Sequence, residues 1–244
     1  MIHHSPLDNV RVVLSHTSHP GNIGASARAM KTMGLSSLYL VNPKSFPDNE
    51  AYVRATNARD ILDQAVICST LDIAMQDCVL AVAMTARTRE LTHQVIDTRQ
   101  VAQKLVEIAT ESPVALVFGR ESSGLTTAEV TKCQLTVHIP TSSTYASLNL
   151  AAAVQIMCYE LRMAAIDPEN QSPRHEAQQL ASLNEIELFY QHLEEALITS
   201  KFLDPQQPKR LMQRIRRLFS RTTLEKEEVN ILRGIIHALA KEKR

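Results

Sequence analysis

Three stretches of the chain place glycines and polar side chains directly after a predicted strand, where α/β proteins bind small ligands. The first stretch, Val12 to Leu35, contains Gly21, Asn22, Gly24 and Arg28. The free N–H groups and the helix dipole attract anions to a helix N-terminus, and a nearby arginine adds a second group that can bind an anion. We therefore expect a glycine-bearing loop followed by a helix, with Arg28 in the first helical turns, as an anion site.

This first stretch departs from the common phosphate-binding loops. Its glycines are spaced G-x-x-G, and the second strand ends in Asn42, where a dinucleotide site has an acidic residue. No Gly-Lys-Ser/Thr follows, so it is not a P-loop either. A nicotinamide-dependent oxidoreductase is therefore disfavoured. His16 and His19 lack a third metal ligand nearby and are interpreted as hydrogen-bonding loop residues, so no metal is expected.

The second stretch runs from Pro113 to Thr126 and leads from a buried apolar strand into Gly119, Arg120 and Glu121. A glycine at a strand end lets a ligand approach the backbone closely. Glu121 is interpreted either as support for the site or as an ion-pair partner of one of two arginines, Arg28 or Arg120.

The third stretch runs from Ile139 to Gln155, where a Ser/Thr-rich loop leads into a long apolar helix. Ser147 either caps this helix or faces a ligand. Asn149 is expected within a buried helix, where its amide needs a hydrogen-bonding partner.

Short apolar runs alternate with helical patterns through this part of the chain, which predicts a parallel sheet with helices on both faces. The predicted strands are Val10–Leu14, Leu38–Val41, Val79–Ala83, Val114–Phe118 and Leu135–Ile139. The predicted helices are Ala25–Met33, Leu71–Gln76, Thr98–Ala109, Thr127–Lys132 and Ser147–Ala165. Thr126 with Glu129 has the spacing of a capping box.

The C-terminal part reads as a small all-α domain. We predict a first domain over 1–166, a polar linker over 167–179 and a helical domain over 180–244. Ser182 with Glu185 and Thr222 with Glu225 have capping-box spacing, and Pro208 suits the first turn of a helix.

Charge is divided unevenly between the two parts. Residues 1–173 hold 13 basic and 16 acidic residues, whereas 174–244 hold 13 basic and 10 acidic residues. Four arginines recur at helical spacing and form one stripe, with Leu211, Ile215, Leu218 and Phe219 as the expected core face. A stripe of one sign favours phosphate binding over an ordinary solvated face. The stripe consists of Arg210, Arg214, Arg217 and Arg221.

The bulk properties describe an ordinary soluble chain. Its 244 residues are 44% hydrophobic and 21% charged, and the formal net charge is zero. The four cysteines form no CxxC pair and are interpreted as buried thiols in a reducing cytosol. Neither a signal peptide nor a membrane-spanning run is expected, so we predict a cytoplasmic protein.

The three stretches, in this order, resemble the motifs of the SPOUT superfamily of RNA methyltransferases, most closely its SpoU branch of ribose 2′-O-methyltransferases. The matching segments are "GNIGASARA", "LVFGRESSGLT" and "YASLNLAAAVQ". The C-terminal segments "LFYQHLEEAL", "RLMQRIRRLFSR" and "EVNILRGII" resemble those of TrmJ-type tRNA methyltransferases. The resemblance thus covers nearly the whole chain.

This resemblance implies a catalytic domain with a deep C-terminal trefoil knot, a homodimer with the active site at its interface, and S-adenosylmethionine as methyl donor. The implied reaction is methylation of the ribose 2′-OH of cytidine or uridine at tRNA position 32, the first nucleotide of the anticodon loop. Ribosomal RNA as substrate and a catalytically inactive RNA-binding module remain alternatives.

Residue by residue, the resemblance implies catalytic roles for Asn22, Arg28, Glu121 and Ser147. It assigns the donor to Met84, Thr85, Ala86, Gly119, Ile139, Ala146, Ser147, Leu148, Asn149, Leu150 and Ala151. It assigns the RNA to Arg28, Arg87 and the four arginines of the stripe. Relatives carry a small hydroxylated residue at the position of Met84 and serine at that of Ala146, and both positions are expected to contact the donor through backbone atoms.

The role of Arg28 follows from its chemistry. An arginine keeps its proton at any working pH, so it is a poor general base. We interpret Arg28 as a residue that orients a substrate phosphate and stabilises the forming alkoxide. The proton then passes to water, to a phosphate or to Ser147.

Overall fold

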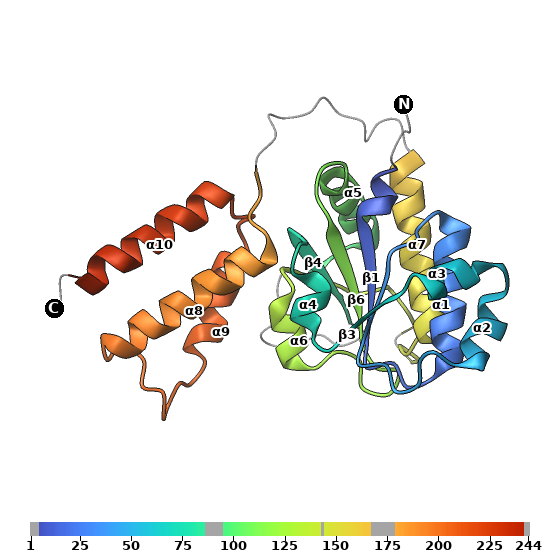
Figure 1. The fold of residues 1–244 in the computed structure, drawn as a ribbon, viewed down its shortest axis with the longest axis horizontal. Coiled ribbons are helices and arrows are strands. Elements are labelled where there is room, and N and C mark those ends of the chain that lie inside the picture. Colours follow the sequence, from blue (N-terminus) through green and yellow to red (C-terminus); the bar gives the residue numbers. More distant parts are fainter. Residues whose placement is uncertain (1–4, 86–94, 143, 167–178, 242–244) are drawn as a thin grey trace. The chain divides into compact units, whose positions relative to one another are not determined.

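The computed structural model describes residues 5–85, 95–142, 144–166 and 179–241 (Figure 1). The chain divides into two compact units, Met1–Ser172 and Pro173–Arg244. No helix among the described residues is long and apolar enough to cross a membrane.

The first unit is built on a seven-stranded sheet in the order β3-β2-β1-β6-β4-β7-β5, in which all pairings are parallel. Because the strands are parallel, their carboxyl ends lie along one edge, where ligands bind in such sheets. The strands are β1 (Val10–Ser15), β2 (Leu38–Val41), β3 (Val66–Cys68), β4 (Leu80–Met84), β5 (Val95–Ile96), β6 (Val114–Phe118) and β7 (Leu135–Val137).

Helices cover both faces of this sheet, as predicted. In Figure 1, α1, α5 and α7 lie on one face and α4 and α6 on the other, while α2 and α3 pack outside α1. The helices of this unit are η1 (Pro6–Asn9), α1 (Pro20–Met33), α2 (Asn49–Ala55), η2 (Thr56–Ala58), α3 (Arg59–Asp63), α4 (Leu71–Met75), α5 (Thr98–Ala109), α6 (Thr127–Lys132) and α7 (Leu150–Ile166).

The five predicted strands all form, with ends within two residues of the expected ones. The sequence pattern missed β3 and β5, which have only three and two residues. In β3, Val66 and Ile67 are exposed at the sheet edge. A strand is recognised in a sequence by apolar and polar residues that alternate, or by an apolar run, over at least four residues. A three-residue strand is too short to show either pattern.

The first helix begins earlier than predicted, at Pro20, so the expected glycine loop is its first turns. A Cβ atom on Gly24 would overlap the backbone carbonyl of Ala51 in α2. Gly24 is therefore a packing residue that lets two helix backbones approach closely, and the interpretation of this glycine as part of an anion loop was wrong. The early start also moves Arg28 from the first turns to the third turn.

The second unit contains three helices, α8 (Leu183–Thr199), α9 (Leu211–Phe219) and α10 (Lys226–Lys241). Phe189 of α8 packs edge-on against Phe219 of α9, with ring centroids 5.1 Å apart. Arg216 of α9 donates two hydrogen bonds to Glu187 of α8 and lies 4.4 Å from the ring centroid of Tyr190. These contacts join the C-terminal half of α9 to the N-terminal half of α8.

The predicted helix caps had mixed outcomes. Ser182 and Thr126 form their capping boxes as predicted. The Thr222 box was wrong, because the Thr222 hydroxyl donates to the Phe219 carbonyl while Glu228 accepts from the Glu225 N–H. Pro208 precedes α9 by three residues and is not in its first turn.

Leu218 was wrongly assigned to the core face of α9. Its side chain is 60% exposed, whereas Phe219 and Arg216 contact α8. The contacts of α9 with α8 are made by Arg216 and Phe219, so the buried face is narrower than the sequence spacing suggested.

Replacing Gly24 by alanine tests the packing role. We expect Gly24→Ala to lower the free energy of unfolding by about 1–3 kcal/mol, the usual cost of forcing extra volume into a packed site. Denaturant unfolding followed by circular dichroism measures this change.

Gly234 provides the matched control, because a Cβ atom there meets nothing within 4 Å in the exposed part of α10. We expect Gly234→Ala to stabilise its helix by up to about 1 kcal/mol. Equal effects of the two substitutions would contradict the packing role of Gly24.

Candidate active site

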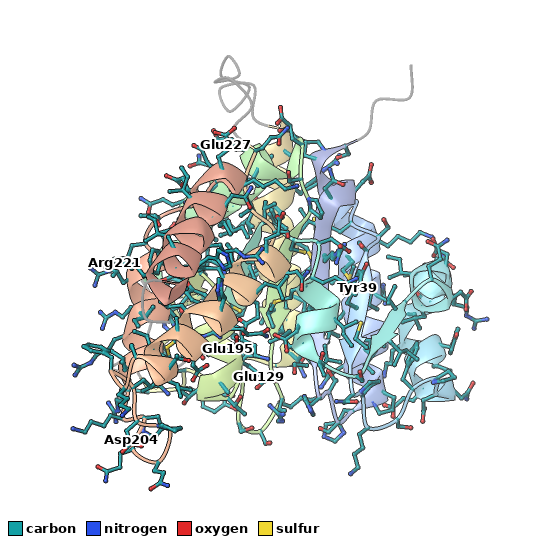
Figure 2. All side chains as sticks on the ribbon, turned by 60° about the vertical axis from the view of Figure 1, so that its left-hand side comes forward. Tyr39, Glu129, Glu195, Asp204, Arg221 and Glu227 are labelled. Carbon is teal, nitrogen blue, oxygen red and sulfur yellow. The ribbon has the colours of Figure 1, made fainter. Side chains whose placement is uncertain are left out.

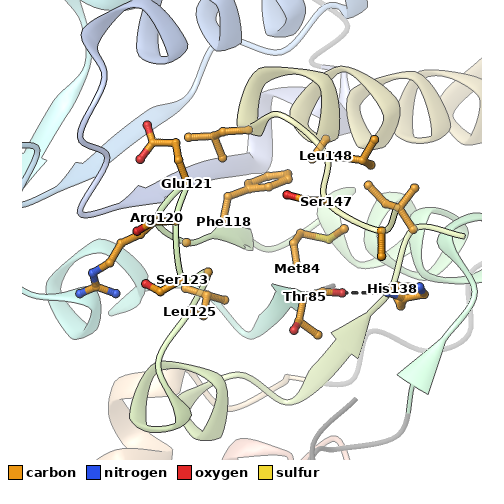
Figure 3. Close-up of a pocket in the computed structure, with 17 residues that line it drawn as sticks. Met84, Thr85, Phe118, Arg120, Glu121, Ser123, Leu125, His138, Ser147 and Leu148 are labelled. Atoms are coloured by element: carbon orange, nitrogen blue, oxygen red, sulfur yellow. Dashed lines mark hydrogen bonds between the residues drawn. The ribbon is translucent and has the colours of Figure 1, made fainter. Parts of the chain in front are cut away.

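A pocket of about 300 Å³ lies at the carboxyl ends of β4, β6 and β7 (Figure 3). The first turn of α7 and the segment before it complete its wall. Its lining combines apolar side chains with a few polar groups, as is usual for small-molecule sites. Eight of the predicted donor-binding residues line it: Met84, Thr85, Gly119, Ile139, Ala146, Ser147, Leu148 and Leu150.

The remaining predicted donor residues lie elsewhere. Asn149 and Ala151 are not among the lining residues. Ala86, together with the predicted RNA contact Arg87, lies outside the described residues. The lining also includes residues that the sequence did not single out, such as Phe118 and His138. His138 is held in place by a hydrogen bond between its Nδ1 and the carbonyl oxygen of Thr85, 3.1 Å away.

Asn149, and not Ser147, caps α7. The Asn149 Oδ1 accepts hydrogen bonds from the N–H groups of Ala151 and Ala152 at 2.9 and 3.4 Å. Asn149 is also exposed, so its expected position within a buried helix was wrong. Because Asn149 caps the helix, the interpretation of Ser147 as the cap was wrong. Ser147 lines the pocket, as does Met84 (Figure 3).

The carboxylate of Glu121 connects the segment after β6 to the N-terminus of α1. It accepts hydrogen bonds from the Ser18 N–H at 3.1 Å, the Ser18 hydroxyl at 2.8 Å, the His19 N–H at 3.2 Å and Asn22 Nδ2 at 3.0 Å. The anion at this helix N-terminus is therefore supplied by the protein itself. Of the two interpretations of Glu121, pairing with Arg28 or Arg120 was wrong, and its bonds are those of a residue that supports the site.

These hydrogen bonds shift the acidity of Glu121. Burial alone raises the pKa of this carboxyl, but the hydrogen bonds from Asn22 and Ser18 favour the charged form and lower the pKa to about 2. Glu121 is consequently ionised at neutral pH, acts as an acceptor and has no proton to donate.

Asn22 extends this network to the third motif. Its Nδ2 donates to Glu121, and its Oδ1 accepts from Asn149 Nδ2 at 3.0 Å. One chain of side chains, Glu121–Asn22–Asn149, thus joins segments 99 and 127 residues apart in the sequence, and Asn149 in turn caps α7. The network positions the helix start that carries Ser147 and Leu148 into the pocket.

A buried carboxylate, that of Glu129, holds the other side of the segment after β6. It accepts hydrogen bonds from the Ser15 hydroxyl at 2.5 Å, Arg120 at 3.0 Å and the Thr126 N–H at 2.7 Å. Burial raises the pKa of Glu129, and these donors outweigh it and lower the pKa to about 2. The capping-box spacing identified Glu129, but no signal in the sequence indicated its bonds to Ser15 and Arg120.

Arg28 does not join either cluster. Its side chain is exposed on α1, it does not line the pocket, and within the described ranges no carboxylate pairs with it. The guanidinium is therefore available to a group outside this chain.

The described residues contain no group of three or more His, Cys, Asp or Glu side chains able to hold a metal ion. All four cysteines are buried. Burial raises the pKa of the Cys78, Cys133 and Cys158 thiols to about 12, which keeps them protonated and unreactive.

Comparison with known proteins places this fold and site in a family. The model of the SpoU rRNA Methylase family matches residues 9–159, and that of the tRNA methyltransferase TrmJ C-terminal domain matches residues 184–244. The chain therefore belongs to the SpoU methylase family, and within it to the TrmJ type.

Similar curated proteins cover nearly the full length. The tRNA (cytidine/uridine/adenosine-2′-O-)-methyltransferase TrmJ of Pseudomonas aeruginosa is 47% identical over 94% of this chain and 93% of its own. The tRNA (cytidine/uridine-2′-O-)-methyltransferase TrmJ of Pectobacterium atrosepticum is 46% identical over 96% of this chain and 98% of its own.

Solved structures agree with the fold. TrmJ from Z. mobilis ZM4 superposes with a TM-score of 0.83 at 30% identity, covering 94% of this chain and 98% of that one. The SpoU methyltransferase AviRb from Streptomyces viridochromogenes, in complex with the cofactor AdoMet, shares the fold with a TM-score of 0.52 at 22% identity. That match covers 63% of this chain and 59% of that one.

The lowered pKa of Glu121 predicts how stability depends on pH. Because the folded state lowers this pKa from 4.5 to about 2, the carboxylate stabilises the fold above about pH 4.5. This contribution disappears as the pH falls towards 2. We expect Glu121→Gln to destabilise the protein at pH 7 and to match the wild type increasingly as the pH falls.

Denaturant unfolding at a series of pH values measures the difference in the free energy of unfolding between wild type and Glu121→Gln. Asn22→Ser, which removes one of the four donors to the carboxylate, should retain part of the pH dependence. If the difference in the free energy of unfolding between wild type and Glu121→Gln stays constant from pH 7 to pH 3, the lowered pKa of Glu121 in the folded protein is contradicted.

Proposed function

We propose that this protein methylates the ribose 2′-OH of cytidine or uridine at position 32 of tRNA, with S-adenosylmethionine as donor. The observation that carries the proposal is the pocket at the carboxyl ends of β4, β6 and β7, with Ser147 on its wall and the Glu121–Asn22–Asn149 network reaching it through Glu121. The curated relatives are tRNA 2′-O-methyltransferases and support the substrate class.

The pocket fits the proposed donor by its size and its lining. Apolar side chains such as Leu125, Ile139 and Leu150 suit a purine ring, and polar lining residues such as Ser123 and His138 suit its polar edge. When bound, S-adenosylmethionine supplies an electrophilic methyl group without a metal. The AdoMet complex of AviRb, which shares the fold, supports this choice of donor.

The chain's own residues position the acceptor hydroxyl. In the proposed reaction, Ser147 hydrogen-bonds to the reacting ribose, and Arg28 orients a neighbouring phosphate and stabilises the alkoxide as it forms. Glu121 is too acidic to take up the proton at neutral pH. The proton passes to water, to a phosphate or to Ser147.

The position of Arg28 supports a homodimer. Arg28 lies outside the pocket of its own chain, so in the proposed dimer the Arg28 of a second copy completes each site. An apolar stripe on α7 offers the contact surface. Tyr159, Met163 and Ile166 recur every three to four residues along α7 and are 47%, 42% and 52% exposed.

The four stripe arginines are the proposed contact for the tRNA backbone. Only Arg214 and Arg217 lie within α9, whereas Arg210 precedes it and Arg221 follows its end, so the predicted helical stripe is shorter than expected. Arg210, Arg214 and Arg221 are exposed, and within the described part of the chain none of the four stripe arginines has an ion-pair partner. Their neighbour Arg216, by contrast, is paired with Glu187. Unpaired cations of one sign give affinity for phosphates rather than a choice of sequence.

The test is a direct methylation assay. Purified protein is incubated with unmodified tRNA transcripts and isotope-labelled S-adenosylmethionine, and nucleosides and fragments are identified by mass spectrometry. We expect labelled 2′-O-methylcytidine or 2′-O-methyluridine at position 32. Label on ribosomal RNA alone would identify the alternative substrate, and donor binding without transfer to either RNA would contradict the proposal.

Substitution of Arg28 tests its proposed role. Arg28→Lys keeps the charge but loses the planar, two-pronged donor geometry. We expect its turnover to fall by about 10²- to 10³-fold, the usual cost of removing one transition-state donor, with donor affinity unchanged in calorimetry. Near-normal turnover of Arg28→Lys would exclude the oriented two-pronged contact.

A further inference from the structure

Phe202 presents an aromatic ring to solvent at the end of α8. Its side chain is 71% exposed, whereas the other four phenylalanines of the chain are buried or half-buried. The Phe202 ring does not line the pocket at the carboxyl ends of β4, β6 and β7. Among the described residues it does not belong to the aromatic cluster of Phe189, Tyr190 and Phe219 either.

The backbone around Phe202 is held firmly, so the exposure is built into the fold. The N–H groups of Phe202 and Leu203 both donate to the Leu197 carbonyl at 3.0 Å, and the Lys201 N–H donates to Ile198 at 2.9 Å. Leu203 is 4% exposed and anchors the segment in the core of this unit. The ring therefore projects from a fixed platform beyond the end of α8.

Basic residues lie next to Phe202 in the chain, on the segment between α8 and α9 and at the start of α9. Figure 2 labels Asp204 of this segment and Arg221, which follows α9. Exposed basic residues flank Phe202 on both sides in the sequence and continue into the arginine stripe. They are Lys201, Lys209, Arg210 and Arg214.

The nearby acid does not neutralise these cations. Asp204 Oδ1 accepts the Gln206 N–H at 2.9 Å, and within the described residues no basic side chain pairs with Asp204. The exposed segment from Lys201 to Arg214 therefore keeps an excess of positive charge, which favours a polyanion over a protein partner with an ordinary mixed surface.

We propose that Phe202 stacks on an unpaired base of the RNA whose phosphates lie along the arginine stripe. An aromatic ring next to unpaired cations is the arrangement by which proteins bind unpaired nucleotides, since the ring takes the base and the cations take the backbone. A base inside a duplex is already stacked on its neighbours and is not available. This inference rests on the proposed tRNA substrate and adds a contact outside the pocket.

The absence of tryptophan from the chain makes a direct test feasible. Phe202→Trp introduces a single fluorophore at the platform, and its emission should be quenched when the full-length protein binds unmodified tRNA. A duplex RNA of the same length should bind through its phosphates with little quenching. The matched control is Ile231→Trp on α10, where the native side chain is 61% exposed and no quenching is expected.

Affinity measurements separate stacking from phosphate contacts. We expect Phe202→Ala to weaken tRNA binding by about 5- to 100-fold, the range found when one stacking side chain is removed, without changing the salt dependence. Arg214→Gln should reduce the slope of log affinity against log salt by about one. Phe202→Tyr should restore most of the affinity, and circular dichroism should show all variants to be folded.

The outcomes distinguish this inference from the proposed function. If wild type binds and methylates tRNA while Phe202→Ala does the same with unchanged affinity, stacking is excluded and the proposed function stands. Equal quenching of Phe202→Trp by duplex RNA and by tRNA would also exclude stacking on an unpaired base. If Phe202→Ala changes the oligomeric mass of the protein and leaves its affinity for tRNA unchanged, Phe202 contacts protein and the inference is excluded. If wild type itself does not bind tRNA, the proposed function fails first.

Discussion

The carboxylate of Glu121 is the constraint on which the site depends. It satisfies two backbone N–H groups that precede α1 and accepts from Asn22, which in turn holds Asn149 at the start of α7. Three segments from distant parts of the sequence are thereby fixed around one charge. Because each hydrogen-bond donor stabilises the ionised carboxylate, these bonds lower the pKa of Glu121 to about 2.

Four arginines among the described residues illustrate two different physical roles. Arg120 and Arg216 are each paired with a glutamate and hold segments together, Arg120 in the first unit and Arg216 in the second. Arg28 and Arg214 are exposed and unpaired among the described residues. An unpaired guanidinium retains its full capacity for phosphate, so the pairing pattern separates structural cations from candidate RNA contacts.

The pattern of apolar runs predicted the parallel sheet and its covering helices, because buried strands and amphipathic helices have strong local signals. It did not predict β3, β5 or the early start of α1 at Pro20. Both strands are too short for a periodic signal. The start of α1 carries a local signal that the prediction missed, a proline at the first helical position, whereas the bonds from Ser18 and His19 to Glu121 join segments far apart in the sequence. The knot implied by the resemblance stays a prediction.

The sequence by itself determined the residue types of the three motifs, the helical C-terminal part and the family to which the chain belongs. Only the tertiary structure decided what each motif residue does. Gly24 serves helix packing, Asn149 caps α7, and Glu121 accepts backbone donors instead of pairing with an arginine. The physical reason is that a hydrogen-bonding partner is chosen by proximity in space, and spacing along the chain does not encode distances between segments that meet only after folding.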